Sequence, residues 1–205
     1  MNLKLVKKVL NLGTMGGFIL LGSSIAAPQR VILIRHADKT IPNSFLYSLN
    51  RKGFKRSIKL ASMILGCFGT PDQIWVYPFN TDNGKHARSY QTSIPLAIAA
   101  KLNPVFAPNF QKGSFQIGNM IQKLSPDKYK LIVLIWRHSY MQELASGLGW
   151  PGMKSIANND FDRLYEFSYR SSTSAPVVTV SSQDKLFSQA CSQDPSNLKL
   201  LVYDE

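Results

Sequence analysis

The sequence predicts an α/β fold with a largely parallel sheet, because apolar runs typical of strands alternate with segments of helical spacing. Two of these runs, 31–34 and 131–136, are continuously apolar, which is typical of parallel strands covered on both faces. Both runs lead directly into an Arg-His pair. The length of 205 residues, 44% of them apolar, suits one domain with a sizeable core.

The expected elements follow in a regular order along the chain. We expect strands at 31–34, 73–77, 105–106, 129–136, 161–169, 176–180 and 198–203, and helices at 51–65, 96–100, 117–124 and 141–148. Asn50 suits the N-cap of the first helix, and Pro95 indicates that the second helix is kinked or begins nearer Ser93. Gly149 is expected to end the last helix. The segment 161–169 is expected at an edge of the sheet.

The charge of the chain favours anionic partners. It carries 24 Lys and Arg residues against 12 Asp and Glu, a formal net charge of +12. Such an excess attracts phosphate esters, nucleic acid or anionic membranes. The basic residues are scattered, with no block of five or more and no zinc-finger spacing, so no nucleic-acid partner is predicted. The charge alone does not choose among these anions; a small phosphorylated substrate is expected from the motifs described below, and the sequence leaves the oligomeric state open.

The first 26 residues have the layout of a secretory signal peptide. A basic start with three lysines precedes a short apolar stretch at 12–21, and small residues follow before Pro28. Cleavage is expected after Ala26, which leaves a domain of residues 27–205 that is exported to the periplasm or secreted. No stable membrane insertion is expected after cleavage. An uncleaved N-terminal anchor is the alternative.

The two cysteines, Cys67 and Cys191, both lie in the expected mature chain. An exported protein meets an oxidising compartment, in which such a pair can form a disulfide. Two free, half-buried thiols remain the alternative, because sequence alone does not bring the two residues together in space.

The two Arg-His pairs predict a phosphate site. Arg35-His36 and Arg137-His138 each follow an apolar strand, and Arg88 lies between them near a helix start. Ligands of open α/β sheets bind beyond the carboxyl ends of strands. Guanidinium groups present paired donors that fit phosphate oxygens. A neutral histidine can attack phosphorus as a nucleophile, and a second histidine can stabilise the charge that develops on the oxygens.

In these motifs the sequence resembles the histidine phosphatase superfamily, which has the phosphoglycerate-mutase-like fold. The resemblance covers roughly residues 29–170. Four blocks carry it, in the family's order: 35–37 (Arg-His-Ala) is similar to an Arg-His-Gly signature, 49–53 (Leu-Asn-Arg-Lys-Gly) to a Leu-Thr-x-x-Gly helix, 88–92 (Arg-Ser-Tyr-Gln-Thr) to an Arg-x-x-Gln-Thr block, and 136–138 (Trp-Arg-His) to the region of the second histidine.

The resemblance implies a three-layer α/β/α sandwich with a mostly parallel central sheet. It implies that His36 is the nucleophile that becomes phosphohistidine. Arg35, Arg88 and His138 would complete the phosphate pocket. No metal and no cofactor are needed in this family, and the residues suggest none.

The general acid of the reaction is the point at which the sequence departs from the family. Many members carry a Glu before the second histidine that protonates the leaving oxygen, yet here no Asp or Glu occurs from Thr92 until Asp127. Asp127 precedes its strand, at the wrong end of the sheet, and Arg137 stands where related bacterial members tend to have Glu. Asp38 and Glu143 are the remaining candidates. Asp38 could instead orient the pocket or pair with Arg137.

Three functions are consistent with these residues. The first is an exported phosphohydrolase that cleaves phosphomonoesters through His36. The second is a catalytically weak or inactive protein that keeps the phosphate pocket. The third is a protein phosphohistidine phosphatase, for which a missing acid matters less because the leaving group is good. The substrate is not evident from the sequence, and the irregular stretches 40–48 and 107–120 are expected either to set specificity or to pack as ordinary loops.

Overall fold

The computed structural model describes residues 27–40, 46–108, 113–170, 175–189 and 191. The predicted signal peptide and the strand predicted at 198–203 lie outside these residues.

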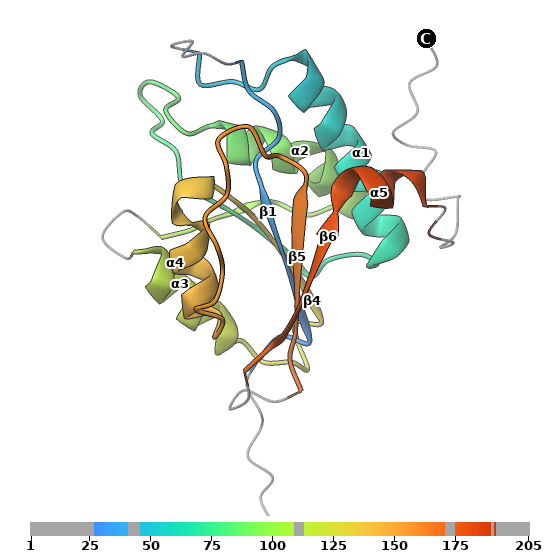
Figure 1. Ribbon diagram of the computed structural model, residues 1–205, viewed down its shortest axis with the longest axis vertical. Helices are drawn as coiled ribbons and strands as arrows, with labels where there is room; N and C mark the ends of the chain where they lie inside the picture. Colours follow the sequence, from blue (N-terminus) through green and yellow to red (C-terminus); the bar gives the residue numbers. More distant parts are fainter. Residues whose placement is uncertain (1–26, 41–45, 109–112, 171–174, 190, 192–205) are drawn as a thin grey trace, which may run out of the picture.

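One six-stranded sheet forms the centre of the molecule, in the order β3-β2-β4-β1-β5-β6 (Figure 1). Its strands are β1 (Arg30–Arg35), β2 (Gln73–Val76), β3 (Val105–Phe106), β4 (Leu131–Trp136), β5 (Arg163–Ser168) and β6 (Val177–Ser182). The first four strands are mutually parallel, whereas β5 pairs antiparallel with both β1 and β6. The predicted mostly parallel sheet is therefore confirmed.

Helices cover both faces of this sheet. On one face lie α1 (Arg51–Cys67) and α2 (Arg88–Ala100), and on the other lie α3 (Ser114–Gln122) and α4 (Met141–Gly147), as Figure 1 shows. Alternate residues of β1 point to the two layers: Ile32 and Ile34 pack toward α1 and α2, whereas Val31 and Leu33 pack toward α3 and α4. The three-layer α/β/α sandwich is thus confirmed, and β1 is buried on both faces.

The first helix begins as predicted. The side chain of Asn50 accepts a hydrogen bond from the backbone N–H of Gly53 at 2.8 Å, which is the bond that an N-cap residue makes. The helix then packs so closely on the loop that follows β1 that a Cβ at Gly53 would clash with the carbonyl group of Asp38. The start of α1 is therefore fixed against the segment that carries His36.

The second helix begins at Arg88 and runs through Pro95. Of the two alternatives that Pro95 left open, the structure therefore excludes a start near Ser93. Its first turns are held by the hydroxyl of Thr92, which donates to the carbonyl of Arg88, and by Ser93, which donates to Tyr90. These bonds stabilise helix before the proline, where periodicity alone gave no signal.

The segment predicted as an edge strand is also placed differently. It forms β5, which lies between β1 and β6, and the edge position belongs to β6. The helix predicted at 117–124 begins earlier, at Ser114, because α3 packs closely on α4 where Gly118 meets Gly147. Tertiary contacts decided both cases.

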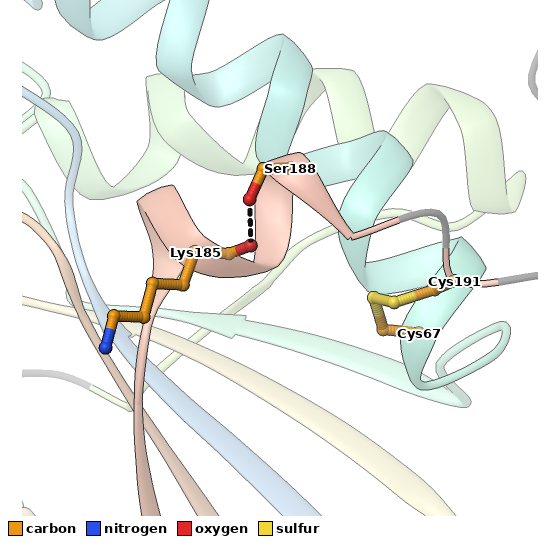
Figure 2. Close-up of a disulfide and its surroundings, with 4 residues drawn as sticks. All are labelled: Cys67, Lys185, Ser188 and Cys191. Atoms are coloured by element: carbon orange, nitrogen blue, oxygen red, sulfur yellow. Dashed lines mark hydrogen bonds between the residues drawn. A yellow bond between two sulfur atoms is a disulfide. The ribbon is translucent and has the colours of Figure 1, made fainter.

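The chain ends its described part with a short helix, α5 (Gln183–Ser188), which packs on α1. Cys67, the last residue of α1, is joined by a disulfide to Cys191 just beyond α5, as Figure 2 shows. The disulfide that the sequence left as one of two alternatives is therefore present. Among the helices that the structure describes, none combines the length and the apolar character that crossing a membrane requires.

Candidate active site

The sheet brings the two predicted histidines to one edge. Strands β1 and β4 are parallel neighbours, with Arg35 opposite Trp136 in register. The backbone N–H of His36 donates to the carbonyl of Trp136 at 3.0 Å, which continues the ladder one step past β1. His138 follows two residues later and begins a short 3-10 helix, His138–Tyr140. The parallel register therefore explains why two distant Arg-His pairs meet.

The ring of His36 is buried, with 5% of the residue exposed. Its Nδ1 lies 2.8 Å from the carbonyl oxygen of Ala37, and a carbonyl can only accept, so Nδ1 carries the proton. Burial, reinforced by the charges of Arg35 and Arg88, lowers the pKa of His36 to about 3. The imidazole is therefore neutral at neutral pH, and its Nε2 keeps a free lone pair.

Arg35 is oriented by backbone carbonyls. Its guanidinium donates to the carbonyl oxygens of Ala157, Asn158 and Asp160 at 2.7–3.0 Å, and it lies 3.9 Å from the ring centre of Phe161. Burial lowers the pKa of Arg35 to about 10, so it stays charged at neutral pH. Its Nε is buried with no hydrogen-bond partner among the described residues.

His138 depends on the same segment. Its Nε2 lies 2.8 Å from the side-chain oxygen of Asn158, so Nε2 donates and Nδ1 keeps the lone pair. That Nδ1 is buried and has no partner among the described residues. Burial, together with the charge of Arg35, lowers the pKa of His138 to about 4. One short segment, 157–160, thus positions both Arg35 and His138, and each keeps one unsatisfied polar atom.

The residues of the 88–92 block hold loops around the site. Arg88 donates from Nε to the carbonyl of Ser48 at 3.1 Å and from Nη2 to that of Leu46 at 2.6 Å. Gln91 accepts from the backbone N–H of Leu49 at 2.8 Å. The hydroxyl of Thr92 accepts from the N–H of Ala37 at 2.9 Å, next to the nucleophile candidate. This block therefore connects α2 with both loops that border the site.

Asp38 is ion-paired on both carboxylate oxygens. Its Oδ2 accepts from Nε of Arg56 at 2.8 Å, and its Oδ1 lies 3.3 Å from Nζ of Lys52. Arg56 in turn contacts Asp184 of α5 at 2.9 Å. The partner of Asp38 is thus Arg56 rather than Arg137, the pairing considered from sequence. Both carboxylate oxygens of Asp38 are therefore engaged by cations of α1.

The other candidate acids lie apart from this pocket. Glu143 accepts from the backbone N–H of Phe115 at 3.4 Å, at the start of α3, and lines a small cavity of about 120 Å³ between α3 and α4. Asp127 precedes β4 and therefore lies at the opposite edge of the sheet. The carboxylate of Asp160 accepts a hydrogen bond from Nε of Arg163 at 2.8 Å. None of these carboxyl groups contacts His36 in the described structure.

Positive charge gathers around the two histidines, and sequence reasoning missed part of it. Arg137 donates to Nε2 of His86 at 3.2 Å, and burial with this neighbour lowers the pKa of His86 to about 4. Burial lowers the pKa of Lys39, as do the charges of Arg88, Arg35 and Arg137. All three histidines of the chain therefore belong to one cationic site. The sequence did contain a signal for this histidine, because His86 stands two residues before Arg88, the predicted phosphate ligand.

The segment 157–160 is the other part that sequence reasoning missed. It acts through backbone carbonyls and through the one amide of Asn158. Carbonyl groups are common to all residues, so no side-chain motif marks such a segment. Within the described part of the chain, no three His, Cys, Asp or Glu side chains group in a way that could hold a metal ion.

Solved structures show the same fold. The protein histidine phosphatase SixA complexed with tungstate matches with a TM-score of 0.57 and 14% identity, over 77% of this chain and 99% of that one. A mycobacterial glucosyl-3-phosphoglycerate phosphatase with inorganic phosphate matches with a TM-score of 0.50 and 10% identity, over 75% of this chain and 95% of that one. No family model and no curated protein matches the sequence. At these identities the similarity is one of fold.

Proposed function

This chain has the fold of the histidine phosphatases, and we propose that it is a phosphohydrolase that cleaves phosphomonoesters through a phosphohistidine on His36. The observation that carries the proposal is the tautomer of His36. A neutral ring that is protonated at Nδ1 presents a free lone pair at Nε2, which is what attack on phosphorus requires. Buried cationic groups around it favour a phosphoryl ligand.

The proposed reaction has two displacements. In the first, Nε2 of His36 forms a bond to phosphorus while the bond from phosphorus to the leaving oxygen breaks. In the second, water attacks the phosphohistidine, the P–N bond breaks, and inorganic phosphate leaves. Nε of Arg35, a buried donor without a partner among the described residues, is well suited to contact a phosphoryl oxygen, and Nδ1 of His138 can do so once it carries a proton.

The leaving oxygen needs a proton, and we propose that it arrives with the substrate. Phosphate esters lose their second proton near pH 6, so a monoanion carries one into the pocket. The negative charge of the bound phosphoryl group raises the pKa of His138 above its low value in the free protein, so that Nδ1 can accept this proton. His138 is then able to donate it to the leaving oxygen. The paired state of Asp38 favours a positioning role for that residue, and Asp38 as the acid is the alternative.

Two other functions follow from specific observations. The fold neighbour SixA is a protein histidine phosphatase, and a site whose carboxylates are already paired suits a good leaving group such as imidazole. A protein phosphohistidine phosphatase is therefore the second candidate. A phosphate-binding protein without turnover is the third.

We also propose that residues 1–26 direct export and are removed. The disulfide between Cys67 and Cys191 supports this, because such bonds persist in oxidising compartments and are rare in the cytosol. Fractionation of cells with an antibody to the chain tests the proposal. A disulfide-bonded periplasmic or secreted form that begins near residue 27 is expected, and a reduced cytosolic form that keeps residues 1–26 would contradict it.

Turnover of an aryl phosphate by the purified protein and by His36→Ala tests the phosphohydrolase proposal. Removal of a nucleophile is expected to lower kcat/KM by about 10³-fold or more. Binding of inorganic phosphate to both proteins, measured by calorimetry, is the control for an intact pocket. Undiminished turnover in His36→Ala would rule out the proposed mechanism. Phosphate binding without turnover in either protein would favour the phosphate-binding protein.

A further inference from the structure

A second cluster of cations lies on α1, where α5 packs against this helix. A groove of about 570 Å³ runs between α1 and α5. Its lining residues are five cations of α1 with one acidic and one aromatic residue of α5: Arg51, Lys52, Lys55, Arg56, Lys59, Asp184 and Phe187. The lining includes none of Arg35, His36, Arg88 and His138, and the groove adjoins the proposed phosphate pocket only through Asp38, which pairs with Lys52 and Arg56.

The cations repeat along the helix in a way that disfavours the helix itself. Arg51, Lys55 and Lys59 follow one another at intervals of four residues, as do Lys52 and Arg56. Like charges at this spacing repel, and cations in the first turn oppose the helix dipole. The first turn of α1 contains no acidic residue that would offset them. The arrangement therefore has no stabilising role within the helix.

Among the described residues, two of the five cations have a carboxylate partner and the other three have none. Lys52 and Arg56 pair with Asp38, and Arg56 also pairs with Asp184. In the described part of the chain, no carboxylate pairs with Arg51, Lys55 or Lys59. Successive turns of a helix are about 5.4 Å apart, so these three cations form a row along the groove. A row of cations that lack a described carboxylate partner matches a chain of negative charges better than it matches a single anion.

The wall opposite the row is fixed in place. Phe187 lies within 6 Å of two groove cations, with its ring centre 5.7 Å from the guanidinium carbon of Arg56 and 5.9 Å from Nζ of Lys59. The disulfide between Cys67 and Cys191 anchors the segment that follows α5 to the end of α1 (Figure 2). The groove is therefore built before any ligand arrives, which lowers the entropy that binding would lose.

We propose that this groove is a binding site for a soluble linear oligophosphate, a small molecule that carries several phosphoryl groups in a row. A hollow lined by cations suits a chain-like ligand better than a flat membrane surface does. A single-stranded nucleic acid needs aromatic faces on which bases stack, and Phe187 already contacts Arg56 and Lys59. The proposal does not depend on the chemistry of His36.

Calorimetry with inorganic tripolyphosphate tests the proposal. The full chain carries His36→Ala so that the probe is not consumed, and excess orthophosphate occupies the pocket at His36. Lys55→Glu/Lys59→Glu reverses two groove charges that contact no catalytic candidate. The new carboxylate at position 55 attracts Arg51 and Lys52, and that at position 59 attracts Arg56, which offsets the repulsion between the two carboxylates, so folding is not endangered. Lys123→Glu/Lys128→Glu changes two exposed lysines elsewhere by the same charge and serves as the control.

The groove variant is expected to raise the Kd of tripolyphosphate at least about tenfold, while the control stays within about twofold. Binding should weaken as salt rises, because the cations are exposed. Equal affinity in the two variants, or no binding under orthophosphate, would overturn the proposal. So would a loss that appears only with anionic vesicles or a single-stranded oligonucleotide, because the groove would then serve a membrane or a nucleic acid.

Discussion

At the level of single residues, His36 and His138 lie beyond the ends of neighbouring strands at one edge of the sheet but have different tautomers. The Nδ1–H of His36 donates a hydrogen bond to a backbone carbonyl, whereas the Nε2–H of His138 donates to the side chain of Asn158. The first ring therefore presents Nε2 to a ligand and the second presents Nδ1. Their partners, rather than their positions, determine which ring can attack phosphorus and which can receive a proton.

Asn158 is predicted to support activity by orienting the ring of His138 and to contribute little to the stability of the fold. Asn158→Ala removes the acceptor that fixes the His138 ring, and a hydrogen bond is worth about 0.5–1.5 kcal/mol. We expect kcat/KM for an aryl phosphate to fall roughly 2–10-fold, with a nearly unchanged melting temperature. Asn158→Asp, which keeps an acceptor at the same place, should restore most of the ring orientation. Equal losses in both variants would contradict this role.

Asp38→Asn separates a positioning role from that of an acid. The change leaves the buried Arg56 without its main counterion, and breaking such a pair costs about 3–5 kcal/mol. We expect a lower midpoint of urea unfolding and equal relative losses of kcat for aryl and alkyl phosphates. An acid would matter far more for the alkyl leaving group. A loss confined to alkyl phosphates would therefore identify Asp38 as the proton donor.

At the level of secondary-structure elements, the sequence predicted what periodicity and caps determine. The apolar runs of β1 and β4, the N-cap at Asn50 and the approximate extent of α1 followed from residue types alone. The early start of α3 and the inner place of β5 depend on tertiary contacts and were missed, whereas the start of α2 was left open between two alternatives. Helix α5 was also missed, since six residues are too few to show a period.

The disulfide is predicted to stabilise the contact between α1 and α5. It closes a loop with a sequence separation of 124, which restricts the unfolded chain strongly. Cys67→Ser/Cys191→Ser should lower the free energy of unfolding by about 2–4 kcal/mol. The same loss is expected for the natural protein under a reducing agent, while the double variant should not respond to it. A reductant effect of equal size in the variant would contradict the assignment.

At the level of the whole molecule, the candidate site could be predicted as a set of ligands but not as an electrostatic environment. Arg35, His36, Arg88 and His138 are brought to one edge of the sheet, which follows from the order of strands. Their neighbours His86 and the segment 157–160 come from separate parts of the chain and have no shared motif. Which residues become buried together depends on the complete fold.

The lowered pKa values of the three histidines predict how the stability of the fold depends on pH. Their pKa values in the fold are about 3 for His36 and about 4 for His86 and His138, below the ordinary value of 6.5. The unfolded chain therefore binds more protons as pH falls from 6.5 toward 4, and stability decreases over that range. We expect the melting temperature to be lower at pH 5 than at pH 7.5. A higher value at pH 5 would contradict these protonation states.

The central claim is tested most directly by trapping the phosphoenzyme. The protein is mixed with an aryl phosphate labelled on phosphorus and quenched in alkali, in which phosphohistidine survives, and its peptides are analysed by mass spectrometry. We predict phosphate on the peptide that contains His36, in Asp38→Asn as in the natural protein, and none on that peptide in His36→Ala. Continued release of inorganic phosphate with no label on His36, or with label on another residue, would contradict the account.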